Sequence, residues 1–178
     1  MNKKYKLTEE YKVINGHKLY RIQAVKNFSD VKEGELGGYI EFQKNLSQEH
    51  DCWIYDDACV MGSSIVYDNA IVKDEAVIFN GYIFDNAVVL GKSFINGGAQ
   101  ICKDAYITLT KDYMVSEPII ESQIHFYLDK NKNIHLYCNN KRCDLSLAVT
   151  LASKLDNRHN SIRNKFLNTC ALAKKTLL

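Results

Sequence analysis

A six-residue pattern repeats from Asp51 to Leu109 and constrains the fold of this chain more than any other feature. In each unit the second residue is small, the fourth is apolar, and the sixth and first are rich in Asp, Asn and Gly. One unit of five residues, Gly81–Asp85, interrupts the series and is aligned with Tyr82 at the second position. The fourth position is then occupied by Ile54, Val60, Val66, Val72, Ile78, Phe84, Val89, Ile95, Ile101 and Ile107.

This period matches neither the 3.6-residue repeat of an α-helix nor the two-residue alternation of a simple strand. It is typical of a parallel β-helix, in which each unit supplies one short strand and one corner, and three units close a turn of about 18 residues. Successive turns stack at a strand spacing of about 4.8 Å, so we expect the fourth side chains to point inward in columns. A β-sandwich whose strands recur every six residues is the alternative.

The outward positions of the repeat carry more apolar surface than a folded chain leaves in water. We expect the N-terminal segment, the C-terminal domain or a second copy of the chain to cover it, and a homo-oligomer would suit a flat repetitive face. The side chains assigned to this packing are Trp53, Tyr55, Ile71, Phe79, Val88, Leu90, Phe94 and Tyr106.

Residues 1–50 are expected to form a hairpin and a cap in front of the repeat, which spans residues 51–109. The segment Lys12–Ile22 predicts a β-hairpin, because Asn15-Gly16 in its centre favours a tight turn with positive φ. The glycines at 34–38 lack the Gly-Lys-Ser/Thr ending of a phosphate loop. We interpret them as a bend that covers the first rung, since an uncovered rung is an exposed sheet edge.

Residues 110–178 predict a small α+β domain that begins with a linker and a hairpin formed by 119–128 and 134–138. Asp144 is expected to cap a helix that runs to about Leu155. The apolar face of that helix is predicted to contain Leu147, Ala148, Leu151 and Leu155. A second helix, at 161–177, is predicted to bury Ile162, Phe166, Cys170 and Ala173.

The formal net charge of +2 is unevenly distributed. Residues 51–109 contain three Lys/Arg against eight Asp/Glu, whereas residues 110–178 contain eleven against six, so two different surfaces are expected. The candidate interaction residues are Asp56, Asp57, Asp68, Asp74, Glu75, Asp85 and Asp104 in the repeat and Arg163, Lys165, Lys174 and Lys175 in the second helix. The acids can alternatively be explained as turn-forming residues at the corners of the coil. The bases can alternatively be explained as the ordinary solvent-exposed face of a helix.

The six cysteines show no Cys-x-x-Cys pair and no zinc-site spacing, and we expect neither a metal site nor a cofactor. The sequence after the basic residues at 3–6 lacks the apolar core of a secretion signal. No apolar run approaches the roughly 20 residues that span a bilayer. A cytoplasmic protein without membrane contact is therefore predicted.

The segment Lys32–Glu41, the segment Lys44–Glu49, the segment Cys52–Asp56 and the Asn-Ala-x-Val units resemble a family encoded by phages and prophages. Its members are often described as transferases, because their repeat is similar to the left-handed β-helix of hexapeptide acyltransferases. The resemblance covers roughly residues 10–109 and implies that the coil is left-handed. Together with the flanking segments, this predicts a mainly β protein, with a short left-handed β-helix between an N-terminal hairpin cap and a C-terminal α+β appendage.

Three functions follow from this resemblance. The first is a non-catalytic phage-type binding protein that inhibits a bacterial defence component, as anti-CRISPR proteins do, with its acidic coil against a host nucleoprotein complex. The second is an acyl-CoA-dependent acyltransferase with a histidine as general base, for which His50, just before the first unit, is the nominated residue. The third is a phage structural component. We expect the first, with a protein partner, and leave direct nucleic-acid binding open.

Overall fold

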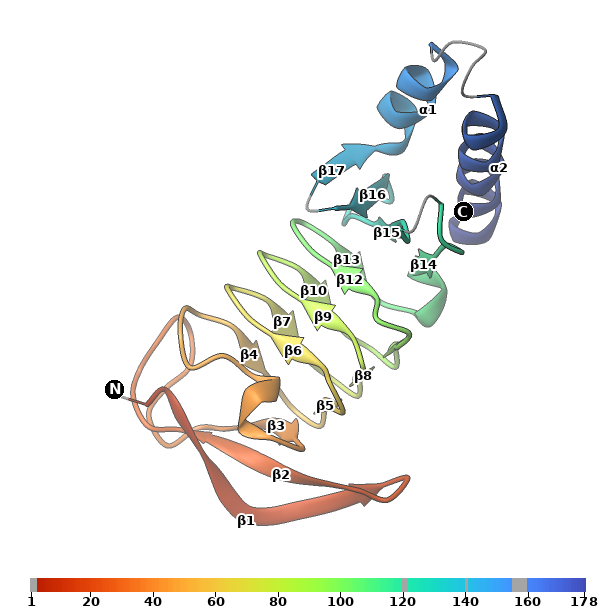
Figure 1. Ribbon diagram of the computed structural model, residues 1–178. Coiled ribbons are helices and arrows are strands. Elements are labelled where there is room, and N and C mark those ends of the chain that lie inside the picture. The colour runs from red at the N-terminus through yellow and green to blue at the C-terminus, as the bar shows by residue number, and fades with distance from the viewer. Residues whose placement is uncertain (1–2, 120–121, 140, 155–159) are drawn as a thin grey trace. The chain divides into compact units, whose positions relative to one another are not determined.

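Residues 3–119, 122–139, 141–154 and 160–178 are described by a computed structural model of the chain (Figure 1). The chain divides into two units, Met1–Thr110 and Lys111–Leu178. Within the described residues, no helix is long and apolar enough to cross a membrane.

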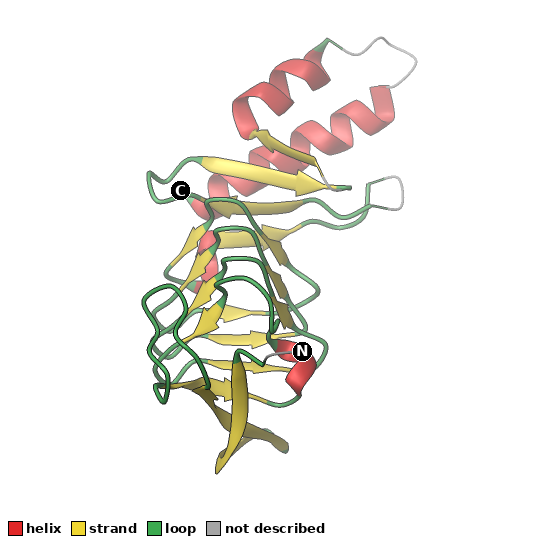
Figure 2. Ribbon diagram, turned by 90° about the vertical axis from the view of Figure 1, so that its left-hand side faces the viewer, coloured by secondary structure: helices red, strands yellow, loops and turns green. Residues whose placement is uncertain are grey.

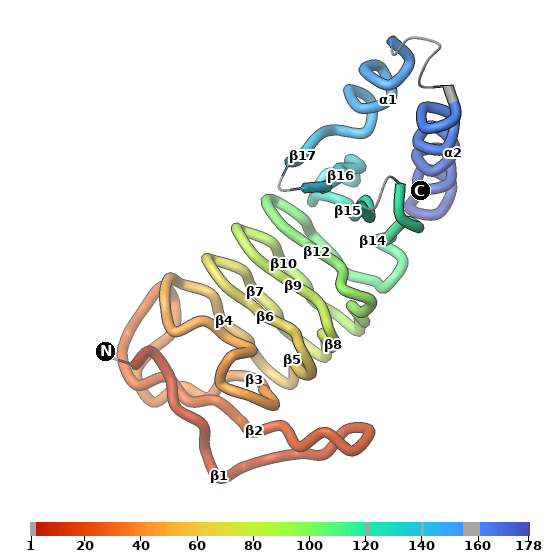
Figure 3. Tube along the Cα trace, viewed as in Figure 1, coloured from red at the N-terminus to blue at the C-terminus, as the bar shows by residue number. Residues whose placement is uncertain are grey.

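The N-terminal unit is built on a left-handed parallel β-helix whose short strands stack in three columns (Figures 1 and 3). One column has the order β13-β10-β7-β4, the second β12-β9-β6, and the third β3-β5-β8-β11. The strands are β3 (Leu36–Ile40), β4 (Trp53–Ile54), β5 (Cys59–Met61), β6 (Ile65–Val66), β7 (Ile71–Val72), β8 (Val77–Phe79), β9 (Tyr82–Ile83), β10 (Val88–Val89), β11 (Phe94–Ile95), β12 (Gln100–Ile101) and β13 (Tyr106–Ile107).

The inward columns confirm the predicted coil, because nine of the ten side chains assigned to the fourth position are 0% exposed. The tenth assignment, Phe84, was wrong: Ile83 pairs with Val66 and is 0% exposed. Phe84 instead stacks on the outward Tyr67, with ring centroids 5.0 Å apart. Gly81 therefore takes the small second position, where an added Cβ would lie 3.0 Å from Ile95 Cγ2, and the short unit lacks its first residue.

The coil begins before the first hexad, since β3 pairs in parallel with β5 through Tyr39 and Ile40. Gly37 and Gly38 lie inside β3 rather than in a bend. A Cβ on Gly38 would lie 2.5 Å from both the carbonyl oxygen of Ala58 and Ile54 Cγ2, so only glycine permits this close approach. Leu46, which follows the 3-10 helix η1 (Gln43–Asn45), bridges Val66 and completes the first turn.

The predicted hairpin is present as β1 (Tyr5–Ile14) and β2 (His17–Ala24), with Asn15 and Gly16 at φ values of 49° and 85°. β2 pairs antiparallel with β3, so the hairpin extends one column of the coil. Its start also covers the open end of the coil. The buried Lys4 donates from Nζ to the carbonyl oxygens of Glu49, His50 and Cys52 at 3.2, 3.1 and 2.8 Å.

The C-terminal unit is a four-stranded antiparallel sheet with two helices. The 3-10 helix η2 (Thr110–Asp112) precedes β14 (Tyr113–Val115), and the sheet continues with β15 (His125–Leu128), β16 (Ile134–Cys138) and β17 (Lys141–Asp144). The helices α1 (Leu145–Ser153) and α2 (Asn160–Leu177) lie side by side (Figure 2). The core contains Phe126, Leu128, Ile134, Leu136, Ala148, Cys170 and Ala173.

The buried face of α1 differs from the predicted one. Ala148 and Ala152 are buried, whereas Leu147 and Leu151 are 51% and 54% exposed. Leu155 lies outside the described residues. In α2, Cys170 and Ala173 are buried as predicted, but Ile162 is 39% exposed. A heptad-like pattern alone cannot tell which of two adjacent apolar stripes meets the sheet.

Candidate functional site

The predicted acidic surface consists largely of corner residues that bind the coil's own backbone. Asp56 Oδ2 accepts a hydrogen bond from the amide of Asp74 at 3.1 Å, and Asp74 Oδ2 accepts one from Gly91 at 2.8 Å. Asp68 and Asp85 form a second column of this kind, which ends on the amide of Lys103. These four aspartates have φ between 53° and 60°, the left-handed region that Asp tolerates better than most residues.

The remaining candidate acids are exposed. Glu75 pairs with Lys92 at 3.4 Å, and Asp57 lies 3.8 Å from Arg21. Asp104 is exposed on the last turn. The seven candidate acids are therefore gathered at two corners of the coil, with Asp56, Asp57, Asp74 and Glu75 at one and Asp68, Asp85 and Asp104 at the other.

The outward apolar side chains are partly covered by the N-terminal segment. Trp53 is 0% exposed and meets Tyr5 and Phe28 edge-on, with ring centroids 6.1 and 5.3 Å apart. The ring of Phe79 meets that of His17 at 5.5 Å. Tyr55 donates a hydrogen bond to Asp30 at 2.6 Å. The others remain half-buried or exposed, namely Ile71, Val88, Leu90, Phe94 and Tyr106.

The basic residues of α2 are dispersed. Lys165 Nζ donates to the carbonyl oxygen of Pro118 at 2.8 Å, while Lys175 is exposed and Arg163 is half-buried. Lys174 lines a cleft, described below. His50, the histidine nominated from the sequence, is exposed at φ 54°, and no described residue hydrogen-bonds to its imidazole.

A different histidine is paired with a carboxylate on the coil. His17, the first residue of β2, places Nδ1 2.9 Å from Oε1 of Glu41, which directly follows β3. The side chains are 33% and 14% exposed, respectively. Glu41 is itself fixed, because its Oε2 accepts a hydrogen bond from the amide of Gly62 at 2.8 Å.

The electrostatics of this pair determine which histidine nitrogen is free. Burial acts to raise the pKa of Glu41, but the hydrogen bonds from the Gly62 amide and His17 outweigh it and lower the pKa. An ionised Glu41 can only accept, so we assign the shared proton to His17 Nδ1. The lone pair of Nε2 is then available to remove a proton from a bound hydroxyl or amine.

The pair was not predicted from the sequence, although the sequence contains a signal for each of its two residues. The Asn15-Gly16 turn places His17 at the start of a strand. Gly38, Tyr39, Ile40 and Glu41 follow the hexad order of small, outward, inward and outward residues. Assigning the first rung to β3 would have shown Glu41 on the outer face of the coil, where β2 passes.

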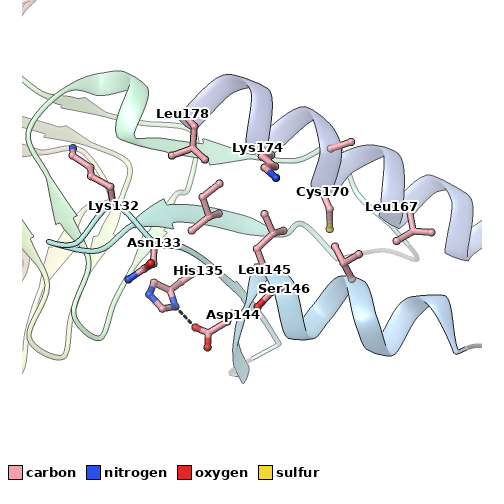
Figure 4. Close-up of a pocket in the computed structure, with 13 residues that line it drawn as sticks. Lys132, Asn133, His135, Asp144, Leu145, Ser146, Leu167, Cys170, Lys174 and Leu178 are labelled. Atoms are coloured by element: carbon pink, nitrogen blue, oxygen red, sulfur yellow. Dashed lines mark ion pairs between the residues drawn. The ribbon is translucent and has the colours of Figure 1, made fainter.

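The C-terminal unit contains a cleft of about 1040 Å³ between β16, α1 and α2 (Figure 4). His135 lies at its polar end, with Nδ1 2.7 Å from Asp144 and Nε2 3.0 Å from Asp129. Asp144 therefore binds His135 and does not cap α1 with its side chain as predicted. Burial acts to raise the pKa of Asp129, but hydrogen bonds from Asn133 and His135 outweigh it and lower the pKa to about 2.

Across the described parts of the chain, no group of three His, Cys, Asp or Glu side chains is placed to hold a metal ion. The six cysteines are free thiols, and burial raises the pKa of Cys170 to about 11. The Cys170 thiol, which lines the cleft, is thus protonated and a poor nucleophile.

Comparison with known proteins gives one informative match. No protein-family model matches the chain. It is 37% identical over 76 residues to the uncharacterized acetyltransferase YdcK of Escherichia coli K12, a match that covers 38% of this chain and 23% of that protein. This similarity contradicts the expected non-catalytic, anti-CRISPR-like role and favours the acyltransferase alternative.

Proposed function

We propose that this chain is an acyltransferase of the hexapeptide-repeat type, in which His17 is the general base and Glu41 orients it. The observation that carries the proposal is the His17–Glu41 pair, set on a coil of hexapeptide rungs. The partial similarity to an acetyltransferase supports the same reaction class. The donor would be an acyl-CoA and the acceptor a hydroxyl or amine.

The roles of the two residues follow from their contacts. The acceptor would donate its proton to His17 Nε2 as its oxygen or nitrogen attacks the acyl carbonyl, and the thiolate of CoA would leave and take that proton from the imidazolium. Glu41 would stabilise the imidazolium that forms, since its carboxylate lies 2.9 Å from Nδ1. The Gly62 amide holds the carboxylate in place, so the pair needs no rearrangement before proton transfer.

A homo-oligomer would complete such a site. Ile71, Val88 and Tyr106 form one half-buried outward column along β7, β10 and β13, and Phe94 is 39% exposed on β11. A second copy could cover this surface and form one wall of a groove for the CoA moiety.

The test is transfer from acetyl-CoA to a panel of amino sugars and amines, with free CoA measured by chromatography because the six cysteines would react with a thiol reagent. His17→Gln should lower the rate by about 10²- to 10⁴-fold, the usual contribution of a general base. Glu41→Gln should also lower it, because its single amide oxygen can accept from His17 Nδ1–H or from the Gly62 amide but not from both.

The matched control is His50→Gln, which changes an exposed histidine of the same unit and should leave the rate unchanged. Calorimetry with acetyl-CoA separates binding from chemistry. Absence of acetyl-CoA binding at millimolar concentration would refute the acyltransferase proposal. Normal binding and turnover in His17→Gln would refute only the role of His17.

A further inference from the structure

We propose that the cleft of the C-terminal unit binds the alkyl chain of a fatty carboxylate, with Lys174 as the partner of its head group. This inference does not depend on the proposed acyltransferase activity, because every residue involved lies in Lys111–Leu178.

The size and lining of the cleft suit an alkyl chain. Its volume, about 1040 Å³, is just above the range of roughly 300–1,000 Å³ in which small-molecule sites fall. Its apolar lining comes from three different elements, so an occupant would be enclosed from several sides. These side chains are Ile134, Leu145, Val149, Leu167, Cys170 and Ala171.

The charges at the cleft select an anion. Asp144 Oδ1 already lies 2.7 Å from His135 Nδ1, and Lys132 Nζ lies 3.7 Å from the buried Asp112. The ammonium of Lys174, which also lines the cleft (Figure 4), has no hydrogen-bond or ion-pair partner within the described residues. Of the cleft's charged side chains, it is thus the cation left to pair with a ligand, and a carboxylate can accept its hydrogen bonds at close range.

An apolar lining with one free ammonium fits a single-chain carboxylate better than a neutral lipid or a peptide. A neutral alcohol of equal length would gain the apolar contacts but not the ion pair. A peptide would bring backbone amides and carbonyls against the apolar part of the lining, where they would lose their hydrogen bonds to water.

The experiment is calorimetric titration of the full chain with sodium decanoate, below the concentration at which it forms micelles. Octanoate should bind about 15-fold more weakly, since two fewer methylenes are buried and each contributes about fourfold. Decanol should bind about 1.5- to 5-fold more weakly than decanoate, the effect of losing one exposed ion pair. Lys174→Gln should weaken the binding of decanoate to the same extent and leave the affinity for decanol unchanged.

Two matched controls separate the cleft from the rest of α2. Lys175→Gln removes a neighbouring exposed cation that does not line the cleft, and it should not change the affinity. Ala171→Trp fills the cleft and should abolish binding, whereas Leu172→Trp, at an exposed position outside it, should not.

The proposal is overturned if decanoate produces no binding heat, if Ala171→Trp binds as the unmodified chain does, or if decanol and decanoate bind equally. Circular dichroism of each variant establishes that α1 and α2 are intact. None of these outcomes bears on acetyl transfer at His17.

Discussion

Protonation of a single histidine should destabilise the C-terminal unit in mild acid. His125, in β15, is 5% exposed, and burial lowers its pKa to about 4 from the ordinary value of 6.5. The unfolded chain therefore binds a proton at a pH where the folded chain does not. Above about pH 6.5 His125 does not lower the free energy of unfolding. Below that pH the free energy of unfolding falls as the pH approaches 4, because only the unfolded chain binds the proton.

The size of the effect follows from the two pKa values. The linkage relation gives a free energy of unfolding about 2 kcal/mol lower at pH 5 than at pH 7. Asp129 adds to the acid sensitivity only at lower pH, because its pKa is lowered to about 2 and its window lies below pH 4. The interval from pH 7 to pH 5 therefore isolates His125 from Asp129.

The assay is urea unfolding of the full chain with two optical signals. Ellipticity at 222 nm follows α1 and α2 of the C-terminal unit. Fluorescence of the single tryptophan, Trp53, follows the coil. Between pH 7 and pH 5 the helical transition should move to lower urea. His125→Gln, which cannot be protonated, should remove most of this shift, whereas His50→Gln should retain it.

If the helical transition of His125→Gln shows the same pH dependence as the unmodified chain, the reasoning from burial is refuted. A shift of the Trp53 transition equal to that of the helices would also contradict it, because the effect would then not be confined to the unit that contains His125.

Three further substitutions test the coil. Gly38→Ala should lower the free energy of unfolding by about 1–3 kcal/mol in the Trp53 signal, since its Cβ would lie 2.5 Å from Ala58 O. Ile83→Ala should cost about 2–5 kcal/mol by the same measurement, and a cost below about 1 kcal/mol would mean that Ile83 does not point inward. Asp74→Ala should cost about 1–3 kcal/mol, because the Gly91 amide loses its acceptor, while Asp74→Asn should retain most of the stability.

The sequence was sufficient to predict the coil because its inward residues repeat at a period that few other folds allow. It was not sufficient to locate Gly81–Asp85 correctly. Phe84 and Ile83 are both apolar, and only stacking on Val66 distinguishes them. The hairpin could be predicted from Asn15-Gly16, since the turn requirement is local.

The candidate site was harder to predict, because its parts meet through tertiary contacts. His17 and Glu41 are 24 residues apart, and their approach depends on β2 pairing with β3. Likewise, His135 is enclosed by carboxylates from a turn and from the end of β17, which no spacing rule connects. The acidic corners were visible in the sequence, but their hydrogen bonds to the next turn were not.

The corners of the coil vary in length without disturbing the alignment of the strands in its columns. Moving up one turn takes 20 positions from Tyr39 to Cys59, 18 from Trp53 to Ile71 and 17 from Ile71 to Val88, yet each pair remains aligned. Insertions and deletions at these bends therefore leave every inward residue facing inward. A chain of this kind can acquire a new loop, and with it a new binding surface, one residue at a time.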